Sequence, residues 1–172
     1  MVEPITNDFN AEMDYWIDQL NDYTPEQFEL KPSASEWSVG QMYQHLLEAT
    51  VYFFKNTREC IQSDTNKHEQ LTLKGQGFFE MGALPAVRIE GPPTNKLTQQ
   101  PESIEYIREK LSSLKEKVNT IFHDLHHNNK GGKKQHFDLG FFAADQWMLF
   151  MYLHLHHHRL QEARLREWLK LN

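Results

Sequence analysis

Two histidines near the C-terminus, His154 and His158, lie four residues apart in a segment whose other inward positions are mostly apolar. Burying two imidazoles costs a few kcal/mol unless each finds a hydrogen bond or a metal ion. We therefore expect this face to enclose a polar partner, and a metal ion is the simplest one. Read at a helical period, the same face carries Trp147, Phe150, Met151, Gln161, Leu165, Trp168 and Leu169.

The spacing of these histidines suits metal binding but does not establish it. Histidines four apart on a helix have Cβ atoms about 5–6 Å apart, so both imidazoles can reach one cation at about 2.0–2.1 Å. His123 and His127 have the same spacing, but they project from the side opposite an apolar stripe, near a helix end. We expect that pair to lie in water. What favours His154 and His158 is their inward position together with their spacing.

A third imidazole, His45, lies on the flank of the apolar face of another predicted helix. Three neutral imidazoles leave a tetrahedral or octahedral ion at least one open position, as catalytic sites require. Zinc, nickel and ferrous iron all suit such ligands, and water on zinc has a pKa that falls toward about 7. His45, His154 and His158 are therefore the predicted metal ligands. A polar core network and an exposed histidine tract are the competing interpretations.

Two further residues are candidates for a catalytic role. Gln161 lies one helical turn past the last ligand and could orient a ligand or a bound water. Glu48, three residues after the first ligand, is a candidate base, although a solvated helix residue is the better supported interpretation. His156 faces away from the inward stripe and is expected to be exposed. His157 lies beside the stripe. It is interpreted either as a hydrogen-bond donor to a ligand or as a residue at the boundary between the buried and the exposed face.

Helical stretches must position these side chains. Ser38 and Gln41 form a predicted capping box at the start of the second stretch, and Trp37 before them is a candidate hydrophobic staple. The third stretch has apolar residues at alternating steps of three and four, and an NNKGGKK run at 128–134 separates it from the fourth. The predicted helices span about 5–21, 39–62, 102–126 and 143–170.

The stretch 63–101 is long and rich in glycine and proline, with an extended-looking piece at 86–90. Its apolar residues predict a packed excursion over one end of the helices: Phe78, Phe79, Leu84, Val87 and Ile89. The fold class expected is all-α, a four-helix bundle with a long packed loop between the second and third helices. At 172 residues, we expect one domain over 1–172.

Composition excludes several classes of function. A formal net charge of −6 with no long Lys/Arg run argues against nucleic acid or a membrane surface as partner. The first residues lack the pattern of a signal peptide, and no run of about 18 apolar residues occurs, so a soluble, cytoplasmic protein is expected. One cysteine, Cys60, excludes an internal disulfide and fits a reducing compartment. We expect it to be a packing residue.

Two segments carry a resemblance to a known family. They are Glu36-Trp37-Ser38 with Gln41 and His45-Leu46, and the late segment His136-Phe137 through Gly140, Asp145-Gln146-Trp147 and 154–161. Together they resemble the W-S-x6-H-L and H-x3-H elements of the DinB-like (YfiT-like) superfamily of four-helix-bundle metalloproteins. The resemblance implies the same three ligands, His45, His154 and His158. One departure is that similar sequences usually have His-Pro where this chain has His136-Phe137.

The resemblance implies a range of activities. Some members are transferases that join low-molecular-weight thiols such as bacillithiol or mycothiol to electrophiles, and others are metal-dependent isomerases or hydrolases, so fold and ligands do not fix the reaction. The leading hypothesis is a metalloenzyme whose divalent ion activates a thiol or water for attack on a small-molecule substrate. A thiol on the ion would be deprotonated outright. Hydrolysis is the runner-up. The sequence is also compatible with a non-catalytic metal- or ligand-binding bundle, which could form a homodimer, and with a bundle whose histidines bind nothing.

Overall fold

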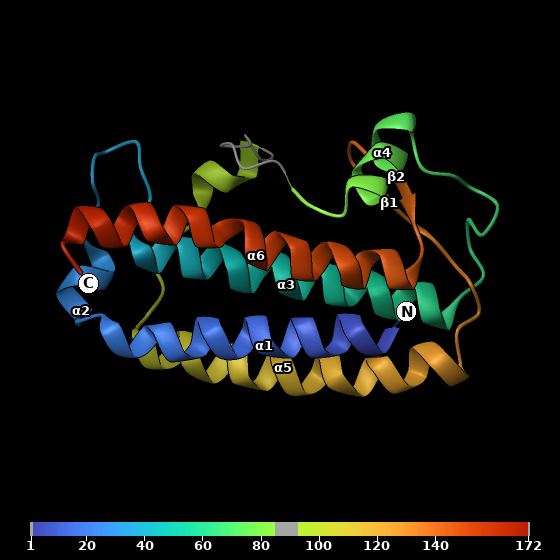
Figure 1. Cartoon of the computed structure of the whole chain (residues 1–172), viewed down its shortest axis with the longest axis horizontal. Helices are drawn as coiled ribbons and strands as arrows, with labels where there is room; N and C mark the ends of the chain where they lie inside the picture. The colour runs from blue at the N-terminus through green and yellow to red at the C-terminus, as the bar shows by residue number, and fades with distance from the viewer. Residues whose placement is uncertain (1, 85–92, 172) are drawn as a thin grey trace.

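The computed structural model describes residues 2–84 and 93–171 (Figure 1). This part of the chain is mostly helical, with one small two-stranded sheet, as expected of an all-α fold. No helix within it is both long enough and apolar enough to cross a membrane. The elements are α1 Val2–Gln19, η1 Leu20–Asp22, α2 Pro25–Glu29, α3 Val39–Gln62, α4 Leu73–Met81, η2 Pro93–Leu97, α5 Ile104–His127, β1 Lys134–His136, β2 Gly140–Phe142 and α6 Ala144–Leu169.

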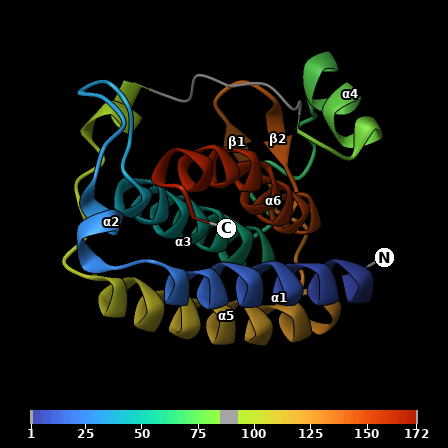
Figure 2. The same cartoon turned by 60° about the vertical axis from the view of Figure 1, so that its left-hand side comes forward.

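Four long helices, α1, α3, α5 and α6, correspond to the four predicted stretches. Helices α1 and α3 each pack against both α5 and α6. Figures 1 and 2 show α3 beside α6 in one layer and α1 beside α5 in the other. Their apolar stripes meet between the layers because each stripe follows the helical period. The α5 stripe is buried as predicted, and it consists of Ile104, Ile107, Leu111, Leu114, Val118, Ile121 and Leu125.

The predicted capping box fixes where α3 begins. Ser38 Oγ accepts from the Gln41 backbone N–H at 3.0 Å, and Gln41 Oε1 accepts from the Ser38 N–H at 3.3 Å. The same two side chains hold the segment before α5, since Ser38 Oγ donates to Gln100 Oε1 and Gln41 Nε2 donates to the Thr98 carbonyl. The start of α3, and with it the register of every later α3 residue, is thereby set.

The described part of the segment 63–101 contains two helices that were not predicted from the sequence, α4 and η2. Two glycines in α4, Gly75 and Gly77, lower its intrinsic helix propensity, so tertiary packing must compensate. Thr72 caps the helix by accepting from the Gly75 N–H at 3.1 Å. A Cβ at Gly75 would lie 2.1 Å from the Leu139 carbonyl oxygen, so only glycine permits this close approach.

The apolar residues of α4 pack against the last part of the chain. The Phe78 ring lies 5.4 Å from that of Phe150, and the Phe79 ring lies 4.9 Å from that of Phe142. This agrees with a packed excursion over one end of the long helices. The extended-looking piece at 86–90, with Val87 and Ile89, lies outside the described residues.

A short hairpin, β1 paired antiparallel with β2, precedes α6 and was also not predicted from the sequence. Its turn is organised by His136, whose Nδ1 accepts from the backbone N–H groups of Asp138 and Leu139, both at 3.3 Å. The His136 ring is nearly buried and stacks on Phe142 at an interplanar angle of 7°. Both hydrogen bonds require an unprotonated Nδ1, so the turn depends on a neutral imidazole.

We expect the hairpin to weaken in acid through His136. Burial lowers the pKa of His136 to about 4, from the ordinary value of 6.5. In the unfolded chain this imidazole is protonated near pH 6.5, whereas in the folded chain it is protonated only near pH 4. The free energy of unfolding therefore decreases as the pH falls between those two values. The slope is at most about 1.4 kcal/mol per pH unit for one proton.

The substitution His136→Asn tests this, because an amide oxygen can replace the Nδ1 acceptor without titrating. In urea unfolding of metal-free protein, the free energy of unfolding of the variant should decline less steeply than that of the wild type, by about 1 kcal/mol per pH unit between about pH 6 and pH 4.5. Other titrating groups cancel in the difference. Parallel curves for the two proteins would show that His136 does not cause the acid sensitivity.

Candidate metal centre

His45 lies in the second turn of α3, on the helix that packs against α6. The capping box at Ser38 fixes its position, and its ring is partly buried. The Trp37 ring, from the residue before the N-cap, lies 5.0 Å from the imidazole between ring centroids. The sequence pattern predicted only a staple role for Trp37, and the structure shows that it also covers a candidate ligand.

His154 and His158 come from α6, whose orientation is fixed near its start. Gln146 Oε1 accepts from the Ala143 N–H at 2.9 Å, and the fully buried Trp147 ring stacks on Phe53 at 26°. His154 lies seven residues after Trp147 and so falls on the same face of the helix. The helix start and this buried anchor together turn the two histidines toward α3.

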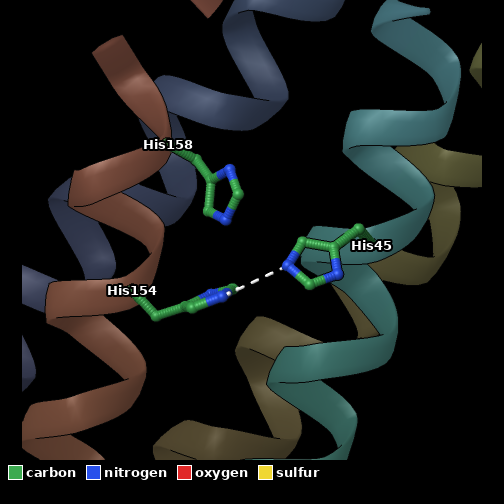
Figure 3. Close-up of side chains that lie close together, drawn as sticks. All are labelled: His45, His154 and His158. Carbon is green, nitrogen blue, oxygen red and sulfur yellow. Dashed lines mark hydrogen bonds between the residues drawn. The ribbon is translucent and has the colours of Figure 1, made fainter. Parts of the chain in front are cut away.

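The structure brings the three predicted ligands together, as Figure 3 shows. The ring centroid of His45 lies 5.1 Å from that of His154 and 5.0 Å from that of His158, and the latter two lie 4.7 Å apart. Each histidine offers one ring nitrogen such that all three nitrogens lie within 4.8 Å of one another. Among the described residues, this is the group of three or more side chains that could hold a metal ion.

Hydrogen bonding alone leaves this group poorly satisfied, which fits a bound cation. His158 Nδ1 lies 2.8 Å from Gln161 Oε1, and because an amide oxygen only accepts, Nδ1 carries the proton and Nε2 keeps its lone pair. The Nε2 atoms of His45 and His154 lie 3.2 Å apart, and His154 Nδ1 is buried without a partner in the described chain. A cation between the rings would use the inward lone pairs of all three.

The electrostatics of the group also suit metal binding. Burial lowers the pKa of His45 to about 4 and that of His158 to about 3. Burial and the neighbouring histidines hold the pKa of His154 well below its ordinary value of 6.5. The three imidazoles are therefore neutral at pH 7, and the neutral form is the one that binds a metal.

Two aromatic rings form the inner wall of the group. The centroids of Phe53 and Phe150 lie 5.3 Å and 6.5 Å from that of His154, and both phenylalanines are nearly buried. Both residues belong to the hydrophobic core, and they also shield one side of the histidines from water. A dry wall strengthens electrostatic interactions at the centre.

Glu48, the candidate base, is not part of the group. Its side chain is exposed and accepts from Gln44 Nε2 at 2.7 Å. It lines a surface hollow between α3 and α5 together with Tyr106 and Lys110. Residues three apart differ by only about 60° around a helix, but His45 faces α6 while Glu48 lies on the neighbouring side of α3, toward α5.

The remaining histidines lie outside the group. His123 and His127 are exposed on α5, with ring centroids 4.6 Å apart. His157 is partly buried, and its ring stands at 82° to that of His158. His156 is largely exposed, as expected, but its Nδ1 also lies 3.2 Å from Glu12 Oε2.

Glu12 and Glu162 are buried carboxylates that were not singled out from the sequence, with 3% and 1% exposure. Glu12 Oε1 accepts from Arg159 Nε at 2.7 Å. Both carboxylates join α1 to α6, and neither belongs to the group of three ligands. Alternating charges along a helix are typical of a solvated face, and only the packing of α1 on α6 shows that these two carboxylates are buried.

Gln161 is expected to set the orientation of His158. We predict that Gln161→Ala weakens metal binding about 10- to 100-fold, because residues that hydrogen-bond a metal-ligating imidazole have effects of this size. Gln161→Glu keeps the acceptor and should bind metal much more tightly than Gln161→Ala. Competition with a chelator dye measures both affinities. Equal affinity of Gln161→Ala and wild type would show that packing alone orients the imidazole.

A family model described as the DinB superfamily matches residues 9–161 of the chain. A search of curated proteins found no match. The matched range contains all three histidines of the group as well as Gln161.

Proposed function

The chain belongs to the DinB superfamily, and on that premise we propose that it is a metal-dependent enzyme acting on a small molecule. His45, His154 and His158 would hold a divalent cation such as zinc, nickel or iron. We further propose that residues 1–172 form one domain of the four-helix-bundle type. The single observation that carries the proposal is the convergence of three neutral imidazoles from α3 and α6.

The residues around the group have separable roles in this proposal. When bound, the cation would supply a Lewis acid that lowers the pKa of a thiol or a water at its open position. Gln161 holds the His158 ring with Nε2 turned inward. Phe53 and Phe150 exclude water from one side, and Trp37 covers His45.

We favour transfer of a low-molecular-weight thiol over hydrolysis. In the described residues no carboxylate lies within the group, and Glu48 is turned away from it, so no acidic side chain is placed to serve as general base toward water. A thiol is acidic enough to lose its proton to solvent. Its sulfur would then form a bond to an electrophilic carbon of the substrate, and the leaving group would depart with the electron pair of the broken bond.

The test uses untagged protein, whose metal content is first measured by elemental analysis. The metal-loaded protein is then assayed with pairs of thiols and electrophiles and with a panel of esters and amides, and His154→Ala is the matched control. Thiol consumption that occurs with the wild type and not with His154→Ala would support the proposal. Hydrolysis alone would favour the hydrolase, and stoichiometric metal without turnover would favour a non-catalytic metal-binding protein. Absence of metal binding would overturn the proposal.

A further inference from the structure

The charge of the candidate metal centre restricts what it can bind. Its three ligands are neutral, no acidic side chain belongs to the group in the described chain, and the adjacent side chains are uncharged: Trp37, Phe53, Phe150 and Gln161. A divalent cation held there would keep its full double charge. Because the surroundings are partly buried, that charge is screened less than in water. The centre therefore favours a partner with negative charge.

Arg164 adds a further positive charge near one side of the centre. It lies on α6 one turn after Gln161, and its side chain is exposed. Arg164 follows Gln161 by three residues, which is about 60° around the helix, and Gln161 Oε1 lies 2.8 Å from His158 Nδ1. The guanidinium therefore projects from a position next to the residue that contacts the ligand. The guanidinium group is the side chain best suited to grip a carboxylate with two parallel hydrogen bonds.

Arg164 differs from the other arginines of the same helix. Arg159 Nε donates to the buried Glu12, and Arg166 Nη1 donates to Asp22 and Gln19. Arg164 makes no ion pair or hydrogen bond with residues 2–84 or 93–171. Arg159 and Arg166 thus hold α6 against α1 and against η1, which follows α1. The guanidinium of Arg164, in contrast, is available to a ligand.

We propose that the centre selects a substrate or co-substrate that carries a carboxylate besides its reacting atom, and that Arg164 binds this carboxylate. The inference rests on the proposed metal centre. It goes further by specifying that the bound substrate or co-substrate is negatively charged and that Arg164 recognises it. Along the helix axis, Arg164 lies about 9 Å beyond His158, and helical side chains lean toward the N-terminus of their helix. The long arginine side chain and a molecule of about three carbons can together span that distance.

The experiment measures binding and needs no turnover. Protein loaded with Co²⁺ is titrated with 3-mercaptopropionate and with the neutral 3-mercapto-1-propanol, a thiol of matched size, and the visible absorption of Co²⁺ reports thiol binding. We expect the wild type to bind the carboxylate-bearing thiol about 10-fold more tightly. Arg164→Gln should reduce this preference to about twofold or less, and Arg164→Lys should retain part of it.

Lys55→Gln is the matched control, because it removes one exposed positive charge from α3 at ten residues from His45. A rise of about 15 Å exceeds the screening length of about 8 Å at physiological salt, so this variant should keep the full preference. An unchanged preference in Arg164→Gln, or equal affinity of the wild type for the two thiols, would overturn the inference while the metal centre stands. Failure to bind Co²⁺ would instead overturn the metal centre itself.

Discussion

Replacing His154 or His158 with alanine is expected to abolish stoichiometric metal binding, with a loss of affinity of more than about 100-fold. Each substitution removes one of three convergent imidazoles. Two neutral ligands hold a divalent cation far less tightly than three, and the cavity left by the lost ring admits water. Isothermal titration of the metal-free protein with Zn²⁺ measures the effect. His45→Ala is expected to behave in the same way.

The chain supplies a matched control for this experiment. His123 and His127 have the same spacing and nearly the same ring separation, 4.6 Å against 4.7 Å for the proposed ligands, but they are exposed on α5. Alanine at either of them should leave stoichiometric binding intact. Equal losses from the two pairs would mean that the centre has been assigned to the wrong histidines. Anomalous scattering at the absorption edge of the metal would then locate it.

Replacing Glu162 with alanine is expected to destabilise the fold by about 3–5 kcal/mol. The carboxylate accepts from the hydroxyls of Tyr15 at 2.6 Å and Tyr23 at 2.9 Å, and Arg166 Nη1 lies 3.7 Å away. Burial raises the pKa of both tyrosines, which keeps them protonated as donors. Alanine would leave the buried Tyr23 hydroxyl and the partly buried Tyr15 hydroxyl without this acceptor, and would open a cavity between α1 and α6. Urea unfolding measures the change.

Glu162→Gln separates the loss of charge from the loss of hydrogen bonding, since an amide of the same shape retains one oxygen acceptor. Its cost should be smaller, about 1–2 kcal/mol. The double substitution of Tyr15 and Tyr23 with phenylalanine should reduce the additional effect of Glu162→Ala, because the donors that depend on the carboxylate are gone. A loss below about 1 kcal/mol for Glu162→Ala would show that water replaces the carboxylate.

The long helices could be predicted from sequence because their signals are local. An unbroken apolar stripe identified α5, and the Ser38–Gln41 capping box located the start of α3. The proximity of the three histidines also followed from local patterns, since each lies on or beside an inward face. Metal binding by these residues remains a prediction that titration with Zn²⁺ and elemental analysis can check.

The features that could not be predicted from sequence depend on contacts between distant segments. Helix α4 has weak intrinsic propensity because of its glycines, and it is held by packing on Phe142 and Phe150. The hairpin strands are too short to show a period. Glu48 was a candidate because it is near His45 in sequence, but in the structure it is exposed on the side of α3 that faces α5. Nothing local distinguishes it from Glu162, which only tertiary packing buries.

The ligand-bearing helices are far apart in the chain, since His45 and His154 are separated by 109 positions. A cation shared between them would behave as a reversible cross-link that closes a very long loop, and such links act mainly by restricting the unfolded ensemble. During synthesis the ion could not be captured until α6 had emerged from the ribosome and docked on α3. Metal acquisition would therefore mark the completion of folding, and chelation would loosen the packing of α6 on α3.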